Sequence, residues 1–460
     1  MVKGNSFYTQ LFLVCLCGMA LSSCKPKEKL APMSPGEINL QQFVAIGDGN
    51  TAGYMDDALY KYGQQNSFGA ILQAQLQLVG AGEIFLPLMG SANIGTNSSF
   101  LSKLILGYKT DCLGGIGLSP VRFAQQGEVA SLTTSVYSSQ NKYSNFGVPG
   151  LRMIDMVSTA FGNINLPQHN AFFARMSKDQ FTWPVWSGDW SSVQENIFDG
   201  GYPTFCSIYL GIEDVLPYAR SGATQNPMSP LAGFPGVGFE ESLTQLCGQL
   251  YSQNVKAVVG TIPDITQMPY FTTIPYNGLN LDEANAASLN QIYGPLGFSF
   301  TIGSNPFMIE DPTAGAFGVR PMVEGELILL SAPLDSIKCH QYGSVYPLRD
   351  EFVLTLAELQ EIRNQILAYN QVIRQYSNFH GFAIAETADF YKKLNDGFVY
   401  NGVTMSAKFV SGGAYSLDGI HLNPKGNALL ANVFITAINK TYKASIPLAN
   451  ALFYSSTYFP

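Results

Sequence analysis

An aspartate and a histidine three residues apart, Asp418 and His421, are the residues of this chain best suited to acid–base chemistry. They lie in Ser416–Gly426 (SLDGIHLNPKG). A carboxylate beside an imidazole orients the ring and stabilises its protonated form, so the histidine can serve as general base for a hydroxyl nucleophile. The same pair can also be structural, holding an Asp-Gly turn before a helix. The residue types alone therefore leave both an acid–base pair and a structural turn open.

Three further segments end in residues that could join this pair. Phe43–Tyr54 (FVAIGDGNTAGY) leaves an apolar run through Gly-Asp-Gly, Tyr143–Gly150 (YSNFGVPG) ends in glycine, and Tyr209–Val215 (YLGIEDV) carries two carboxylates. Glycine and aspartate let a chain leave a buried strand abruptly. Because open α/β sheets place their sites at the carboxyl edge, we expect these segments to meet Asp418 and His421 there.

Strand and helix patterns alternate along the chain and would position these segments. Apolar runs that end at Gly or Pro predict buried parallel strands over Phe205–Leu210, Val255–Ile262 and Gly381–Ala385. Apolar spacing and capping residues predict helices over Ser67–Val79, Phe239–Asn254, Thr355 to about Tyr376, and Pro424–Ile438. Strands separated by helices predict an α/β fold, a three-layer α/β/α sandwich around a mainly parallel central sheet.

In their order, the four segments resemble the sequence blocks of the SGNH (GDSL-type) hydrolases, over about Gln41 to Ile438. In that family a serine attacks an ester carbon, and a histidine oriented by an aspartate removes the serine proton. The resemblance implies Asp418 as the acid, His421 as the base, and Gly150 as a backbone donor to the oxyanion.

Two positions depart from the family pattern. Gly49 stands where the nucleophilic serine belongs, and Glu213 stands where an asparagine would bind the oxyanion. Glycine offers no nucleophile, and an ionised glutamate accepts hydrogen bonds where an amide donates them. Losing one oxyanion donor costs ~10²–10³ in rate, and losing a triad nucleophile costs ~10⁶. We therefore expect a degenerate site with no serine-type ester hydrolysis, in which Asp418 and His421 are remnants.

Other interpretations of the degenerate site stay open. Thr51 carries a hydroxyl two positions after Gly49, although family geometry would aim it away from His421. A water activated by His421, with Glu213 as helper, could hydrolyse a substrate slowly. Glu213 could instead pair with His421. A deliberate Ser→Gly inactivation would explain Gly49 but not Glu213.

Long stretches separate the four blocks, which predicts insertions at about 80–141, 161–203 and 263–349. Such excursions gather around the carboxyl edge of a sheet, where they form a cap or a partner surface.

The N-terminus has the features of an export signal. Lys3 precedes the apolar Leu11–Ala20, which is shorter than the ~20 residues of a membrane-spanning helix. Leu21-Ser22-Ser23-Cys24 resembles the lipobox of bacterial lipoproteins, and that resemblance implies cleavage before Cys24 and its acylation. We expect a signal peptide over 1–23, a tether over 24–38 and one hydrolase-like domain over 39–460. An uncleaved anchor and an ordinary secretory signal are the alternatives.

Composition excludes several functional classes. The 460 residues are 46% hydrophobic and 13% charged, with a net charge of −8, which favours a large core and argues against nucleic acid as a partner. The histidines are too scattered for a metal site, and we expect neither a metal nor a cofactor. Four cysteines remain in the mature chain and admit two disulfides in three connectivities: Cys112, Cys206, Cys247 and Cys339.

The ending Gly412–Gly426 resembles that of SGNH-like lipoproteins of Bacteroidota, which often accompany outer-membrane β-barrel proteins. That resemblance implies a non-catalytic, lipid-anchored accessory or scaffold subunit of an outer-membrane β-barrel assembly or transport complex. The alternatives are a carboxylesterase or lipase acting on acylated glycans or lipids, and a glycan- or lipid-binding lipoprotein. The basic Lys25–Leu30 after Cys24 favours the periplasmic face over the cell surface without deciding between them.

Overall fold

A computed structural model describes residues 32–137, 142–163, 166, 169–177, 192–199, 201–457 and 459. The expected signal peptide, Cys24 and most of the tether lie outside the described residues. Within the described part, no helix has both the length and the apolar character to cross a membrane.

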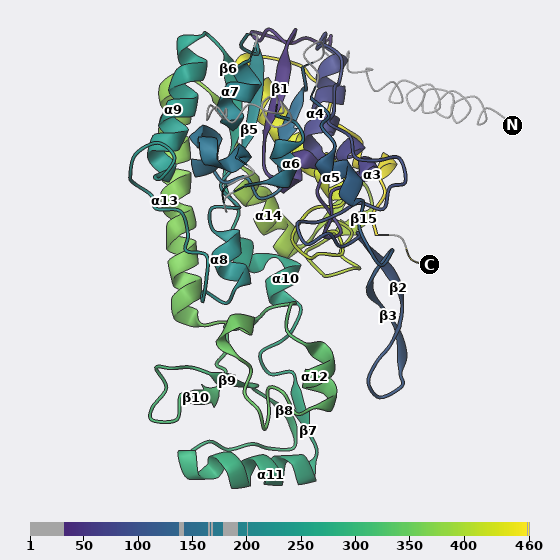
Figure 1. The fold of residues 1–460 in the computed structure, drawn as a ribbon, viewed down its shortest axis with the longest axis vertical. Coiled ribbons are helices and arrows are strands. Elements are labelled where there is room, and N and C mark those ends of the chain that lie inside the picture. The colour runs from purple at the N-terminus through teal and green to yellow at the C-terminus, as the bar shows by residue number, and fades with distance from the viewer. Residues whose placement is uncertain are drawn as a thin grey trace, which may run out of the picture. The chain divides into compact units, whose positions relative to one another are not determined.

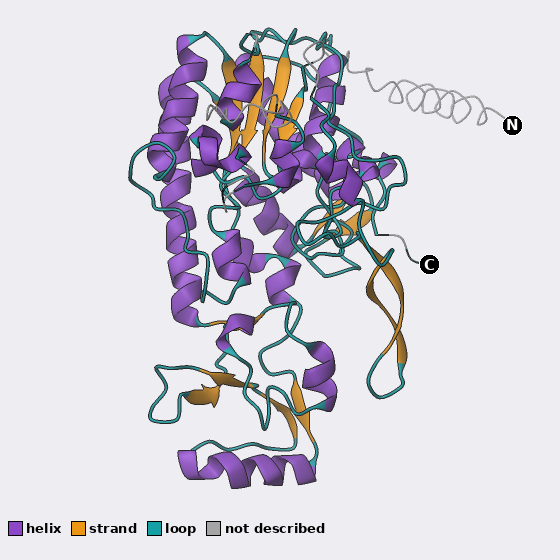
Figure 2. Cartoon of the chain, viewed as in Figure 1, coloured by secondary structure: helices purple, strands orange, loops and turns teal. Residues whose placement is uncertain are grey.

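The centre of the fold is a five-stranded parallel sheet (Figures 1 and 2). The strand order is β13-β6-β5-β1-β4. The strands are β1 (Phe43–Gly47), β4 (Asn145–Gly147), β5 (Phe205–Tyr209), β6 (Lys256–Gly260) and β13 (Ala383–Ala385). Nearly every residue of these strands is buried, as the continuous apolar runs of the sequence predict. The α/β class with a parallel central sheet is confirmed.

Four long helices flank the sheet: α4 (Phe68–Gln77), α9 (Phe239–Ser252), α13 (Leu356–His380) and α15 (Pro424–Tyr442). Their starts follow from local chemistry. Ser67 caps α4, and Asn423 caps α15 with Pro424 at its first position. Thr355 forms the expected capping box with the third residue of α13. The last helix runs about one turn beyond its expected end.

Ring contacts tie these helices to one another and to the sheet. The Phe239 ring of α9 stacks on Tyr369 of α13 with centroids 4.0 Å apart. The Phe434 ring of α15 lies 4.8 Å from Phe68 of α4 and 5.7 Å from Tyr209 of β5. Figure 1 shows α9 and α13 on one side of the strands and α4 on the other.

Further elements complete the described chain. The other α-helices are α2 (Gly49–Ala52), α3 (Lys61–Gln65), α5 (Val129–Thr133), α6 (Ala171–Ala174), α7 (Val193–Phe198), α8 (Leu216–Arg220), α10 (Pro269–Thr272), α11 (Glu283–Tyr293), α12 (Leu334–Cys339) and α14 (Thr387–Asp396). The two-stranded antiparallel pairs are β2 (Leu104–Thr110) with β3 (Ile116–Arg122), β7 (Leu279–Leu281) with β8 (Gly303–Asn305), β9 (Met308–Glu310) with β10 (Val319–Pro321), β11 (Leu327–Ile328) with β12 (Val353–Leu354), and β14 (Phe398–Tyr400) with β15 (Val403–Met405).

The stretches expected as insertions hold most of these small elements. The first contains the β2–β3 hairpin, and the stretch 263–349 contains β7 to β11 with α10 to α12. This later stretch has two small hydrophobic clusters of its own, one around Phe307 and Ile328 and one around Leu289 and Tyr293.

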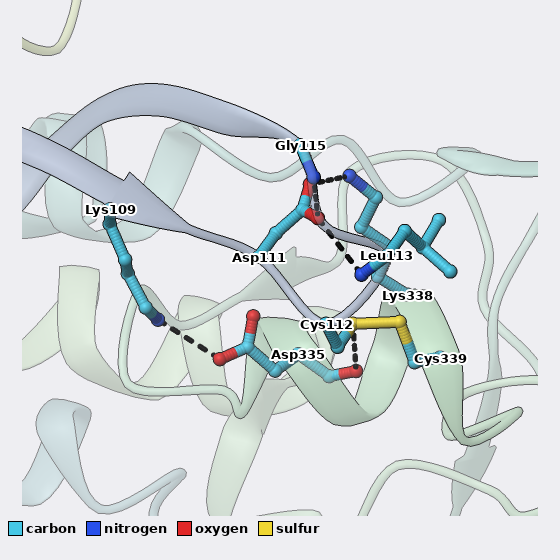
Figure 3. The surroundings of a disulfide bond; sticks show 8 residues. All are labelled: Lys109, Asp111, Cys112, Leu113, Gly115, Asp335, Lys338 and Cys339. Atoms are coloured by element: carbon cyan, nitrogen blue, oxygen red, sulfur yellow. Dashed lines mark hydrogen bonds and ion pairs between the residues drawn. A yellow bond between two sulfur atoms is a disulfide. The ribbon is translucent and has the colours of Figure 1, made fainter.

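A disulfide joins the two stretches (Figure 3). Cys112, in the turn between β2 and β3, is bonded to Cys339 at the end of α12, with Cα atoms 6.4 Å apart. Two ion pairs flank the bond: Lys109 Nζ lies 2.9 Å from Asp335 Oδ2, and Lys338 pairs with Asp111.

The other two cysteines in the described part of the chain form no second disulfide. Cys206 and Cys247 are free and lie on the buried faces of β5 and α9. Burial raises the pKa of the Cys247 thiol to about 12, so the group stays protonated and behaves as a small apolar side chain.

Candidate functional site

The first turn at the carboxyl edge of the sheet places Gly49 at the start of α2. β1 ends at Gly47, and Asp48 caps the helix because its Oδ1 accepts from the Asn50 backbone N–H at 2.9 Å. Gly49 is buried at the first helical position, and its backbone N–H bonds to no acceptor among the described residues. The abrupt exit from a buried strand expected from Gly-Asp-Gly is therefore present, and the structure adds that it leads into a short helix.

Asp418 and His421 form the expected pair. His421 Nδ1 lies 2.9 Å from Asp418 Oδ2, and both side chains are buried. Asp418 Oδ1 accepts from the backbone N–H groups of Ile420 and His421 at 2.8 Å, and Oδ2 accepts from the Asp57 backbone N–H at 3.2 Å. The carboxylate is thus held by four donors, which fixes the orientation of the imidazole.

The charges of the pair shift both pKa values. Burial alone would raise the pKa of Asp418, but the charge of His421 and the hydrogen bonds lower it to about 2. Burial alone would lower the pKa of His421, but its hydrogen bond and attraction to Asp418, with the charges of Glu213 and Asp48, raise it above the ordinary value. The structure therefore favours an imidazolium–carboxylate pair.

The His421 ring occupies the space that a side chain at position 49 would need. A Cβ built on Gly49 would lie 2.7 Å from His421 Nε2 and 3.1 Å from its Cδ2. The Tyr54 ring packs against the imidazole with centroids 5.0 Å apart, and the Tyr54 Cβ would lie 3.3 Å from the Cβ built on Gly49. A serine at position 49 would therefore displace the imidazole, so glycine fits this packing and also supplies no nucleophile.

Glu213 lies near this pair but forms no hydrogen bond or ion pair with another described residue. Burial raises the pKa of Glu213, and the charges of His421 and Arg220 oppose that rise. The Glu213 charge in turn adds to burial in raising the pKa of Asp48 to about 7. Glu213 and His421 interact through their charges, while the direct pairing considered from the sequence is absent.

The other predicted site positions have structural roles. Gly150 has φ +81°, a conformation that favours glycine, and its N–H bonds to no acceptor in the described part of the chain. Asp214 Oδ2 accepts from the Met153 backbone N–H at 2.7 Å and so holds the chain that follows Gly150. A Cβ on Gly47 would clash with Thr51 Oγ1, so that hydroxyl faces β1.

A cavity of about 430 Å³ opens beside His421. Its walls come from several parts of the chain. Tyr54, Asp57, Leu417, Asp418, Ile420 and His421 line it from the sheet edge; Leu104, Ser119, Pro120 and Arg122 line it from the β2–β3 hairpin; Arg220, Tyr270, Leu330, Ser331, Leu334 and Phe409 complete it. Sequence reasoning did not identify Arg122 or Arg220, because neither lies in a recognisable block and only the fold brings them to His421.

A larger cavity of about 540 Å³ lies at the opposite edge of the sheet, beside the start of β1. It is lined by Gln41 to Val44 and by residues such as Lys142 and Tyr143, and it contains none of the predicted site residues. Because this larger cavity does not reach His421, it takes no part in the acid–base chemistry considered for Asp418 and His421.

The described residues contain no group of three or more His, Cys, Asp or Glu side chains that could hold a metal ion. Comparisons with known proteins identify no relative: no family model, no curated protein and no solved structure matches the chain.

Proposed function

We propose that the protein is a non-catalytic, lipid-anchored member of the SGNH-type proteins, with a three-layer α/β/α sandwich. In this proposal it acts as an accessory or scaffold subunit of an outer-membrane β-barrel assembly or transport complex. The observation that carries the non-catalytic part is the position of His421 Nε2, 2.7 Å from where a Cβ of residue 49 would be. A catalytic serine cannot be restored there without moving the imidazole away from its place beside Asp418.

The chain order and position of the predicted blocks support the family assignment. The segments after β1, β4 and β5 all leave the carboxyl ends of neighbouring parallel strands, and Asp418 and His421 meet the first of them. This is the arrangement that the resemblance of the four sequence blocks to the family implies.

The subunit role is supported by the two joined stretches and by their exposed apolar side chains. Tyr108, Leu113 and Ile116 of the hairpin expose 70%, 70% and 73% of their surface, and Phe317 of the later stretch exposes 72%. Several large apolar side chains exposed on one disulfide-linked element are typical of protein interfaces. The disulfide agrees with an oxidising compartment outside the cytoplasm.

Affinity purification of the full-length chain in mild detergent tests the subunit role. The proposal expects a β-barrel membrane protein to co-elute in a fixed ratio, and expects Tyr108→Glu with Ile116→Glu to abolish co-elution. The matched control is Tyr251→Glu, since Tyr251 exposes 58% of its surface on α9. Elution of the wild type alone, or equal co-elution of both variants, would contradict the subunit role.

The second candidate is a hydrolase of acylated glycans or lipids that uses an activated water. It is favoured by one observation, the intact hydrogen bond between Asp418 and His421. The raised pKa of His421 enlarges its protonated fraction, and a base must be unprotonated to accept a proton, so such an activity would increase with pH. Turnover that rises with pH and disappears in His421→Ala would favour this candidate over the non-catalytic protein.

A further inference from the structure

We propose that the cavity beside His421 is a binding site for a small anion, a ligand that carries a carboxylate or phosphate group held between Arg220 and His421. This proposal adds a ligand to the non-catalytic protein and does not depend on a membrane partner. Failure to find a partner complex would therefore leave it standing.

The two carboxylates that line the cavity, Asp57 and Asp418, accept hydrogen bonds from other groups of the protein. Asp418 is held by four donors, as described above. Asp57 is also satisfied: Oδ2 accepts from Arg122 Nη2 at 2.5 Å and from Asn97 Nδ2 at 3.0 Å, and Oδ1 accepts from the Tyr54 hydroxyl at 3.2 Å. Asp418 therefore accepts four hydrogen bonds and Asp57 three from within the protein, which uses most of the acceptor capacity of the two lining carboxylates.

The basic side chains that line the cavity, Arg122, Arg220 and His421, differ in the contacts that they make. Arg122 is engaged by Asp57 and by the Ser102 carbonyl at 2.6 Å. Arg220, in contrast, meets no carboxylate within 4 Å among the described residues; its guanidinium lies over the Tyr270 ring, with Cζ 5.5 Å from the centroid. It is exposed and lines the cavity together with His421, whose Nε2 has no partner in the described part of the chain.

The cavity therefore offers more hydrogen-bond donors than acceptors to a ligand. The lining carboxylates accept most of their hydrogen bonds from within the protein, while the Arg220 guanidinium meets no carboxylate within 4 Å and His421 Nε2 has no hydrogen-bond partner among the described residues. The complement of such a surface is an acceptor with negative charge, and charge-assisted hydrogen bonds to Arg and His are the strong ones. The Tyr54 and Tyr270 rings would bound the ligand on two sides.

The negative charge of Glu213 disfavours an anion in this cavity. Its charge acts on both His421 and Arg220, and it does not line the cavity. The proposal therefore makes two predictions of opposite sign: removing the Arg220 charge weakens anion binding, and removing the Glu213 charge strengthens it.

The experiment follows the His421 ring by NMR in the full-length chain in detergent, with histidine Cε1 labelled with ¹³C. Sodium phosphate, sodium glucuronate and neutral glucose are titrated separately at constant ionic strength. We expect a saturable shift of the His421 signal with at least one anion and none with glucose. Phosphate alone, glucuronate alone, or both would support the site and identify the preferred anion.

The variants provide the decisive comparison. Arg220→Gln is expected to weaken binding by about ten-fold or more, because it removes a charge-assisted contact. Arg220→Lys keeps the charge and should bind with intermediate affinity, and Glu213→Gln should bind more tightly than the wild type. Arg349→Gln is the matched control, since Arg349 also lies over an aromatic ring at 5.5 Å, that of Phe352, but outside the cavity. The absence of a saturable shift with both anions, equal binding to Arg220→Gln, or an equal response to glucose would overturn the proposal.

Discussion

Replacing Gly49 by alanine should destabilise the protein by forcing His421 out of its place. An added Cβ would meet Nε2 at 2.7 Å, whereas ordinary Cβ contacts begin at 3.4 Å. The imidazole must therefore retreat by about 0.7 Å, and a crowded site of this kind costs ~1–3 kcal/mol. The imidazole is bound to Asp418 by the 2.9 Å hydrogen bond and packs against the Tyr54 ring, so its displacement weakens these contacts.

The matched control for this variant is Gly248→Ala. Gly248 lies within α9, and a Cβ built there meets nothing within 4 Å. Alanine in a helix is favoured over glycine by about 0.5–1 kcal/mol, so this control should be slightly more stable than the wild type. Both glycines are helical, so the comparison isolates the contact with His421.

Urea unfolding and NMR titration of the His421 ring measure the two consequences. We expect the Gly49→Ala protein to unfold at lower urea than both the wild type and Gly248→Ala. We also expect its His421 pKa to fall toward the ordinary value, since displacement weakens the attraction to Asp418. If Gly49→Ala gains stability as Gly248→Ala does, with an unchanged His421 titration, the steric argument is refuted.

Two further predictions concern the disulfide and the buried aspartate. Replacing both Cys112 and Cys339 by serine should lower the free energy of unfolding by about 2–5 kcal/mol and speed hydrogen exchange in β2 and β3. It should also make diethyl pyrocarbonate modify His421 faster, because the hairpin forms one wall of the cavity beside His421. Unchanged hydrogen exchange and unchanged modification would show that other contacts hold the hairpin in place. Asp418→Asn should lower the free energy of unfolding by about 2 kcal/mol near pH 6, because folding lowers the pKa of the Asp418 carboxyl from 3.8 to about 2. The ionised carboxyl stabilises the protein above pH 3.8, and this contribution is lost as the pH falls toward 2. Urea unfolding from pH 7 to pH 2 checks this sign, and a gap between the two proteins that persists at pH 2 would contradict it.

The sheet and its long helices could be predicted because their signals are local. Buried strands such as β5 and β6 are continuous apolar runs, and the capping box at Thr355 marks the start of α13 within the sequence itself. The pair of Asp418 and His421 was also predictable, since its members are three positions apart and both hydrogen bonds and charge act at that range.

The remaining features depend on contacts between distant segments. The pairing of Cys112 with Cys339 spans 227 positions, and sequence alone left the connectivity open. The approach of Arg220 to His421 and the contact of His421 with Gly49 arise only when the short elements close over the sheet edge. The sequence showed that Gly49 lacks a nucleophile, and the structure adds that the imidazole has taken up its space.

The measurement that tests the central claim most directly is hydrolysis of p-nitrophenyl acetate by the full-length chain, with His421→Ala as the matched variant. The account predicts that the wild type and His421→Ala release p-nitrophenol at the same background rate, and that a fluorophosphonate probe leaves the mass of the wild type unchanged. Wild-type turnover above background that is lost in His421→Ala would contradict the claim that this site performs no ester chemistry.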